Sequence, residues 1–171
     1  AGCRMGQFVG LSDHEGLDMR GRSISVDGPI DMQACVPDVT SFANRRVIRN
    51  GIFDASASTD WDAASVTSSG TYNTGNPLSL TGVTNVANIE VGSLVTGTGV
   101  GREVYVTETN LGAQTVTLSQ PLYGAVGTQT YTFTRFRYML DFSGFDSMSR
   151  FNIAEIEIKC DGIASGVMLS K

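Results

Sequence analysis

The segment YMLDFSGFDSMSRFNIAEIEIKCDGIASGVMLSK, residues 138–171, decides the fold class. Ile156, Ile158 and Cys160 alternate with charged residues, which is the two-residue period of a strand with one buried face. Short apolar runs at 139–142 and 167–169 lie on either side, each next to a Ser-Gly pair. The turns between these runs leave no room for a crossover helix. Parallel stacking of the strands therefore requires a chain that coils like a solenoid.

The composition favours one all-β domain of ordinary size. The 171 residues include 20 glycines and only 17% charged residues, and serine and threonine are frequent. The net charge of -5 argues against nucleic acid and anionic membrane surfaces as partners, because both attract basic patches. No apolar run reaches the roughly eighteen residues of a membrane-spanning helix, so we expect no membrane insertion.

The cysteines and the histidine suggest no metal or catalytic site. Cys3, Cys35 and Cys160 form no CxxC pair and are odd in number, so neither a zinc site nor a disulfide framework is expected. Cys160 is predicted to pack as a small apolar residue. His14 lies between two acidic residues whose side chains alternate in direction on an extended chain, which favours a surface loop.

The glycine-rich stretch GTGVG at 97–101 does not predict a cofactor. It lacks the Lys-Ser/Thr that completes a phosphate-binding loop, and no helical pattern follows it. We expect turn glycines here, no cofactor and no metal.

The two ends of the chain carry the coiled pattern. We expect residues 1–16 to form an N-terminal cap or linker, 17–61 the first coils, and 136–171 a continuing coil of a longer polypeptide. A strand through Ile24 is expected to end at Asp27-Gly28-Pro29, and the Arg-Gly-Arg and Asn50-Gly51 stretches are predicted turns. The interval from Ile24 to Ile48 resembles that from Leu140 to Val167, as if each spanned one circuit.

Residues 62–135 have a different texture, poor in charge and rich in threonine and glycine. Short alternating strands recur between turn residues, which predicts a small antiparallel barrel or sandwich inserted into the coil. The flanks 48–56 and 136–144 would then be adjacent rungs. The strands are expected around the pairs Leu78 and Leu80, Val104 and Val106, Val116 and Leu118, and Tyr131 and Phe133.

Two parts of the chain resemble a known family. Residues 17–62 and 135–171 resemble the β-helix portion of spike or fibre proteins of alphaproteobacterial gene transfer agents and related phages, within the pectate-lyase-like group. The stretches LDMRGRSISVDGPIDMQA, RRVIRNGIFDASASTDW and RYMLDFSGFDSMSRFNIAEIEIKCDGIASGVML carry this resemblance. The insertion is similar to a module of phage and bacterial surface proteins through VGSLVTGTGVGREVYV, QTVTLSQPL and TYTFT. No single motif in these stretches is diagnostic of a reaction.

The resemblance implies a fold, an assembly and a function. The fold would be a right-handed parallel β-helix, assembled as a homotrimer on the surface of a virion or gene transfer agent particle, as a head spike or tail fibre. Its partners would be other virion proteins, at the spike base, capsid or tail, and host capsular polysaccharide. The function would be attachment of the particle to the host surface. The alternative is a capsule-degrading polysaccharide lyase or hydrolase whose catalytic residues lie outside this segment.

Aromatic and amide residues near the predicted turns are candidate sugar contacts, because saccharide sites commonly combine aromatic faces with amides and carboxylates. The alternative is that these side chains only pack. The candidates are Trp61, Tyr72, Asn73, Tyr105 and Tyr123.

Arg45, Arg46 and Arg49 form the one basic cluster. Projecting outward, they would either pair with acidic residues on a neighbouring rung or protomer, which is a structural role, or contact anionic sugars.

Glu155 and Glu157 are the only candidate pair of catalytic carboxylates. On a regular strand they face one side with Cα atoms roughly 6.5–7 Å apart, near the spacing used by inverting glycosidases. The same alternation is how a half-buried strand solvates its outer face. We therefore assign no catalytic residue.

Overall fold

The computed structural model describes residues 16–33, 45–145, 147 and 150–169. The regular elements within them are strands and two short 3-10 helices, η1 (Thr59–Trp61) and η2 (Val86–Asn88), so the predicted all-β class is confirmed. The chain divides into two compact units. The coil unit runs up to Asp62 and resumes at Arg137, and the inserted unit spans 63–136. The expected cap or linker at 1–16 lies almost wholly outside the described residues.

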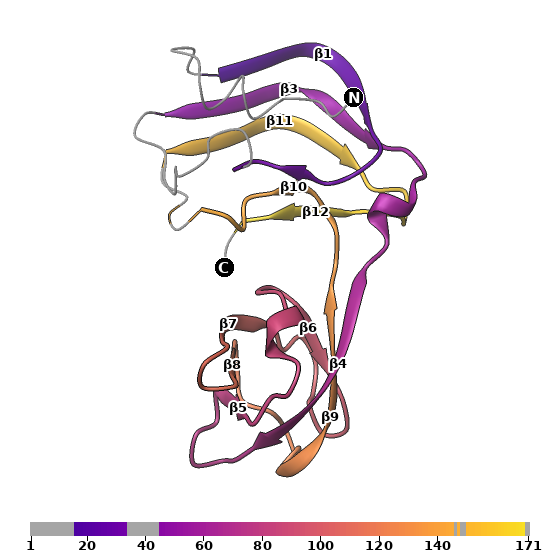
Figure 1. Ribbon diagram of the computed structural model, residues 1–171. Coiled ribbons are helices and arrows are strands. Elements are labelled where there is room, and N and C mark those ends of the chain that lie inside the picture. Colours follow the sequence, from indigo (N-terminus) through magenta and orange to yellow (C-terminus); the bar gives the residue numbers. More distant parts are fainter. Residues whose placement is uncertain (1–15, 34–44, 146, 148–149, 170–171) are drawn as a thin grey trace. The chain divides into compact units, whose positions relative to one another are not determined.

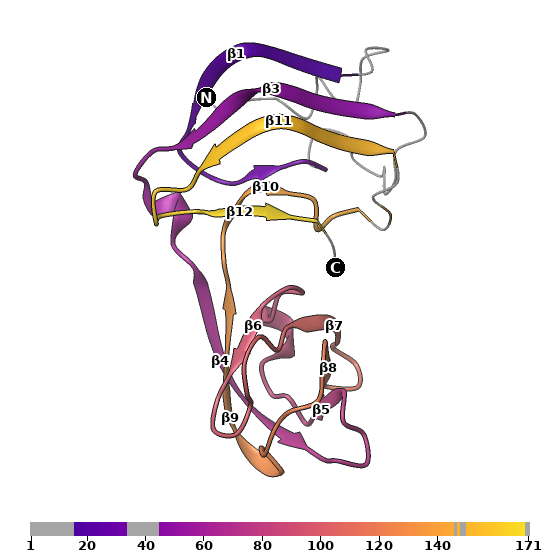
Figure 2. The same ribbon diagram turned by 180° about the vertical axis from the view of Figure 1, so that it is seen from behind.

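The coil unit is made of two parallel three-stranded sheets (Figure 1). The chain passes from the long sheet to the short sheet three times, β1 to β2, β3 to β10 and β11 to β12, and the strands keep the same order in both sheets. The view from behind shows the same two layers (Figure 2). The long sheet contains β1 (Gly16–Val26), β3 (Arg46–Ala55) and β11 (Phe151–Lys159), and the short sheet contains β2 (Ile30–Asp31), β10 (Tyr138–Asp141) and β12 (Ser165–Met168).

The register corrects two predictions and confirms one. Leu140 pairs with Val167 as expected. Ile24 pairs with Phe53, and Ile48 pairs elsewhere, so the first circuit was counted wrongly. The flanks of the insertion are also not adjacent rungs, because β3 lies in the long sheet and β10 in the short sheet. Circuits differ in loop and bend length, so intervals along the sequence cannot fix which residues stack.

Each strand of the long sheet bends at a residue with left-handed backbone. Arg20, Asn50 and Glu155 have φ of 53°, 59° and 54°. In β3 and β11 the bends lie at the same level, between the paired positions of Arg49 and Gly51, and in β1 the register shifts between Asp18 and Arg22. The predicted turns at Arg-Gly-Arg and Asn50-Gly51 are therefore bends inside continuous strands. Asparagine tolerates this conformation better than most residues.

Gly51 is required at the bend of β3 because Met19 of β1 fills the space beside it. A Cβ at position 51 would lie 2.5 Å from both the Cβ and the Sδ of Met19. The coil therefore packs a large side chain of one strand against a bare Cα of the next.

The core of the coil unit lies between the two sheets and is unevenly covered. Ile48 and Phe53 of the middle strand β3 are 0% exposed. The inward residues of β11, including Ile156, pack on this core but are only half-buried. The buried members are Met19, Val26, Ile30, Met32, Ile48, Phe53, Ala55, Trp61, Met139, Leu140, Phe142 and Phe145.

The inserted unit is a six-stranded antiparallel sheet with the order β6-β9-β4-β5-β8-β7. Its longest ladder joins β4 and β9 from Ala64↔Arg135 to Tyr72↔Gly127. The two end strands are also linked, since Val95 N–H donates to Val104 at 2.7 Å and Val106 N–H donates to Ser93 at 2.9 Å. The strands are β4 (Ala64–Tyr72), β5 (Ser79–Thr81), β6 (Leu94–Thr96), β7 (Val106–Asn110), β8 (Thr115–Leu118) and β9 (Gly127–Arg135).

The alternating pairs predicted in this unit mark its core with one exception. Leu80, Val104, Val106, Val116, Leu118, Tyr131 and Phe133 are all buried. Leu78 directly precedes β5 and is 43% exposed, so only Leu80 of this pair belongs to the core. Strand β4 escaped prediction, since ASVTSSGTY offers too few apolar residues to show a period.

Among the described residues, no helix is long and apolar enough to cross a membrane.

Candidate functional site

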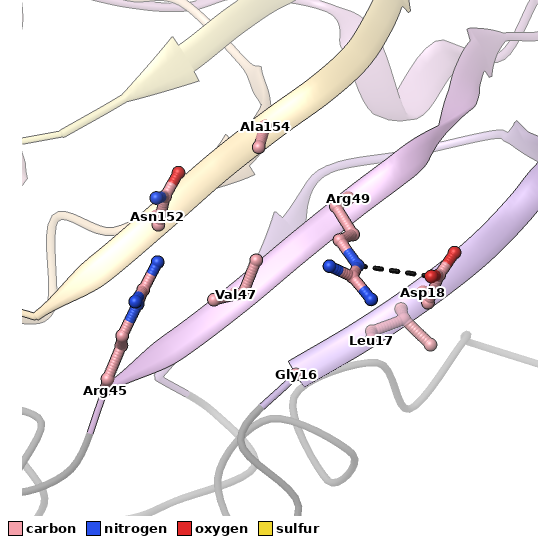
Figure 3. A pocket seen from close by; sticks show the side chains of 8 residues that line it. All are labelled: Gly16, Leu17, Asp18, Arg45, Val47, Arg49, Asn152 and Ala154. Atoms are coloured by element: carbon pink, nitrogen blue, oxygen red, sulfur yellow. Dashed lines mark hydrogen bonds and ion pairs between the residues drawn. The ribbon is translucent and has the colours of Figure 1, made fainter.

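A groove crosses the outer face of the long sheet and takes residues from all three strands (Figure 3). Its volume is about 320 Å³, within the size range of small-molecule sites. It is lined by Gly16, Leu17, Asp18, Arg45, Val47, Arg49, Asn152 and Ala154.

Strand alternation and register together create this surface. Ile48 points into the core, so its neighbours Val47 and Arg49 point outward. Parallel pairing then brings side chains from sequence-distant strands to the same level. One level contains Gly16, Val47 and Asn152, and the next contains Asp18, Arg49 and Ala154.

Glycine at position 16 lets β1 approach β3 closely at one end of the groove. A Cβ there would lie 2.7 Å from the carbonyl oxygen of Val47, too close for any side chain. Val47 and Ala154 supply an apolar floor beside it. The floor thus presents apolar side chains between polar groups.

Asp18 is fixed by three donors. Its carboxylate accepts from the backbone N–H of Arg20 at 2.9 Å, from Asn50 Nδ2 at 3.2 Å and from Arg49 Nε at 3.1 Å. The backbone hydrogen bond from Arg20 is the largest cause that lowers the pKa of Asp18, followed by Asn50 and the charge of Arg49. Asp18 is therefore ionised near neutral pH.

The three arginines of the predicted cluster do not share one face of the strand. Arg45 and Arg49 line the groove on either side of Val47 (Figure 3). Arg49 pairs with Asp18 on the neighbouring strand, the kind of inter-rung contact that the structural interpretation expected. Arg46 lies at the alternate position of the strand, which faces away from the groove, and its Nε is buried without a hydrogen-bond partner. The three guanidinium groups therefore do not project together.

Two of the predicted sugar contacts lie in the cores. Trp61 is 5% exposed and its indole N–H donates to the Ser56 carbonyl at 2.9 Å. Tyr72 is 2% exposed, and its hydroxyl accepts from the Leu122 N–H at 3.2 Å. Neither ring offers a face to a ligand, because both pack as the alternative interpretation expected.

The remaining predicted contacts belong to the inserted unit. Asn73 is exposed, with its side-chain oxygen accepting from Gly75 N–H at 2.8 Å, and Tyr105 is half-buried. Tyr123 is 93% exposed on a loop held by Gly124 N–H donating to Gly99 at 2.8 Å. None of these residues lines the groove.

The glutamates of β11 do not keep the regular alternation that the spacing of roughly 6.5–7 Å assumed. The left-handed bend at Glu155 shifts the alternation, and Lys159 Nζ lies 3.9 Å from Glu157 Oε1. Neither residue lines the groove, whose one carboxylate is that of Asp18. Two-carboxylate glycoside hydrolysis therefore has no counterpart among the described groove residues. His14 lies outside those residues, and Cys160 is a half-buried free thiol.

No family model, curated protein or solved structure matches this chain. Its function must therefore be argued from the geometry above.

Asp18, Val47, Asn152 and Ala154 escaped the sequence-based search because only the register brings them together. One signal was present. The dipeptides Arg20-Gly21 and Asn50-Gly51 each come directly after one charged and one apolar residue. Each dipeptide lies at a bend of its strand. Aligning β1 and β3 on these dipeptides places Asp18 opposite Ile48, one residue short of its observed partner Arg49, because the register shifts at the bend of β1.

Proposed function

We propose that this chain is a non-enzymatic attachment protein that binds saccharide through the groove on its long sheet. The observation that supports this proposal is that the groove spans all three parallel strands and combines an apolar floor with hydrogen-bonding side chains. Saccharides suit such a surface because their rings have apolar faces and hydroxyl edges. The outer face of stacked strands is also long and continuous, which fits a polymer better than a small metabolite.

The proposal includes the architecture that the resemblance implies. Three passes through two parallel sheets support a short right-handed parallel β-helix, and the bonds between β6 and β7 support a small barrel as the insertion. In this proposal the chain forms a homotrimer on the surface of a virion or gene transfer agent particle, docked on other virion proteins. Its ligand is host capsular polysaccharide. Several copies on one particle would give useful avidity from weak individual sites.

Polysaccharide binding through the groove can be tested with a variant that fills it. Ala154→Phe places an aromatic ring on the groove floor, and Ala57→Phe adds the same ring at an exposed position beyond the end of β3. We expect a panel of bacterial capsular polysaccharides to retard the unmodified chain in affinity electrophoresis, and Ala154→Phe to lose this retardation while Ala57→Phe keeps it. Equal retardation of both variants, or none by any polymer, would contradict the proposed site.

The same mixtures of purified chain and polysaccharide can distinguish attachment from degradation. An attachment protein leaves the polymer intact, whereas a lyase produces unsaturated sugars and a hydrolase produces reducing ends. The groove offers one ionised carboxylate and no second one, which supports attachment. Release of either product by the purified chain would contradict the non-enzymatic proposal. The alternative places the catalytic residues outside this segment, so its test is the same assay on a longer polypeptide that contains the segment.

A further inference from the structure

The unused hydrogen-bonding capacity of the groove points to a charged ligand. Arg45 and Arg49 lie on one strand with Val47 between them, and both line the groove. Each guanidinium has five N–H donors in a fixed fork. Arg49 uses its Nε for Asp18 at 3.1 Å, and the side chain of Arg45 has no bond to any described residue. Most of the donors around Val47 therefore face solvent.

Asp18 orients one of these cations without neutralising the groove. The carboxylate is fixed by Arg20 and Asn50 as well as by Arg49, so it acts as a rigid anchor for the Arg49 guanidinium. Two arginines against one aspartate leave the lining with a local charge of +1. This contrasts with the chain as a whole, whose net charge is -5.

The number of cations limits what the ligand can be. Nucleic acid binding needs many phosphate contacts and a broadly basic surface, and this chain has neither. Two arginines suit one planar anionic group, because a guanidinium pairs with a carboxylate through two parallel hydrogen bonds. The apolar floor of Val47 and Ala154 suits the ring that carries this group, and Asn152 offers an amide beside Arg45 (Figure 3).

We infer that the groove selects acidic saccharides, with the carboxylate of a uronic acid residue bound between Arg45 and Arg49 and the sugar ring packed over Val47 and Ala154. This inference rests on the proposed function and narrows its ligand class. Arg45 supplies the main ionic contact since it is uncommitted, and Arg49 supplies its free terminal N–H groups. Asn152 contacts ring hydroxyls.

The test compares acidic polymers with neutral versions of the same chains. The probes are alginate, hyaluronan and polyglucuronate, each alongside its carboxyl-reduced product, with dextran sulfate as a second anion. The proteins are the unmodified chain, Arg45→Gln, and the control Arg22→Gln, which removes an exposed arginine of β1 outside the groove. Unfolding temperatures establish that both variants fold.

We expect at least one uronate polymer to bind and its carboxyl-reduced form to bind at least about tenfold more weakly, because charge-assisted hydrogen bonds are lost. Arg45→Gln should weaken binding by a similar factor and Arg22→Gln should not. Binding should also fall with rising salt, since the contacts are exposed to solvent.

Three outcomes would overturn the inference. Equal binding of acidic and reduced polymers, or binding of neutral capsules alone with loss in Ala154→Phe, would leave the proposed attachment function intact and remove the acidic specificity. Equal binding of dextran sulfate would show that the groove recognises negative charge without requiring a carboxylate. Absence of binding to every polysaccharide would remove the proposed function as well.

Discussion

The coil unit and the inserted unit bury the apolar faces of their β-sheets in different ways. In the inserted unit each strand pairs antiparallel, the two end strands are linked, and the core residues are almost completely buried. In the coil unit the strands pair in parallel across long stretches of sequence, and only the middle strands, β3 and β10, have a neighbour on both sides. The inward residues of the edge strand β11 are half-buried, whereas the opposite edge strand β1 buries Met19 and Val26. An edge strand of a stacked coil lacks one of the two neighbours that cover its side chains.

The two units also differ in where a ligand can bind. The buried side chains of the inserted unit fill its core, and Tyr123 on one of its loops is 93% exposed. Stacked parallel strands give the coil unit an outer face on which every level repeats across three rungs. That repetition is what places Asp18, Arg49 and Ala154 in one row.

The largest effect should come from opening either core. Phe53→Ala removes a ring that is 0% exposed and should cost the coil unit about 3–5 kcal/mol of unfolding free energy. Phe133→Ala should cost the inserted unit a similar amount, since its ring is 1% exposed. The sole tryptophan, Trp61, belongs to the core of the coil unit, so its fluorescence reports the unfolding of that unit.

The two cores share no buried residue, so we expect Phe53→Ala to move the Trp61 transition in denaturant and Phe133→Ala to leave it in place. Hydrogen exchange of the β4 and β9 amides should show the reverse pattern. If Phe133→Ala moved the tryptophan transition as much as Phe53→Ala does, the two units would unfold together. That result would contradict the description of two separate cores.

A smaller effect should come from crowding the bend between two rungs. Gly51→Ala forces a methyl group against Met19 and should destabilise the coil unit by about 1–3 kcal/mol, the usual cost of overpacking. Gly166→Ala on β12 is the matched control, because no atom lies within 4 Å of its added Cβ. Chemical denaturation followed by Trp61 fluorescence measures both. A neutral Gly51→Ala would mean that β1 does not stack on β3 as described.

The smallest effect should come from the Asp18 carboxylate. Its pKa in the folded state lies below the ordinary 3.8, so its contribution to stability is present above that value and is lost as pH falls through the folded pKa. Asp18→Asn should remove this contribution, so the unfolding temperature of the variant should fall less than that of the unmodified chain between pH 6 and acid pH. Parallel curves for the two proteins would show that the carboxylate has no special environment.

The sequence predicted the class of each unit better than the contacts within them. Alternation at Val116 and Leu118 or at Tyr131 and Phe133 is a local property, and these residues are buried as expected. The stacking of Ile48 on Ile153 is not local, since it depends on bends at Asn50 and Glu155 that no apolar period reveals.

The candidate site was only partly visible for the same reason. Arg45 and Arg49 are visible as a basic cluster, but Asp18 and Asn152 lie 27 residues or more from Arg45 along the chain and join it only through the register. Trp61 and Tyr72 were conspicuous in the sequence and are buried. Composition shows which side chains are available, whereas burial decides which of them meet a ligand.

The most direct test of the account is to ask which strands of the long sheet touch. Asp54 pairs with Ser25 on one side and with Lys159 on the other. With Cys3, Cys35 and Cys160 replaced by serine, Asp54→Cys should form a disulfide with Ser25→Cys and, separately, with Lys159→Cys, because paired Cα atoms on neighbouring strands lie about 4.8 Å apart. The pair Ser25→Cys and Lys159→Cys should not, being two strands apart and beyond the roughly 7 Å limit. Mass spectrometry after mild oxidation reads all three pairs. Bridges in the first two alone support the three-rung surface, and a bridge in the third, or none to Asp54→Cys, would contradict it.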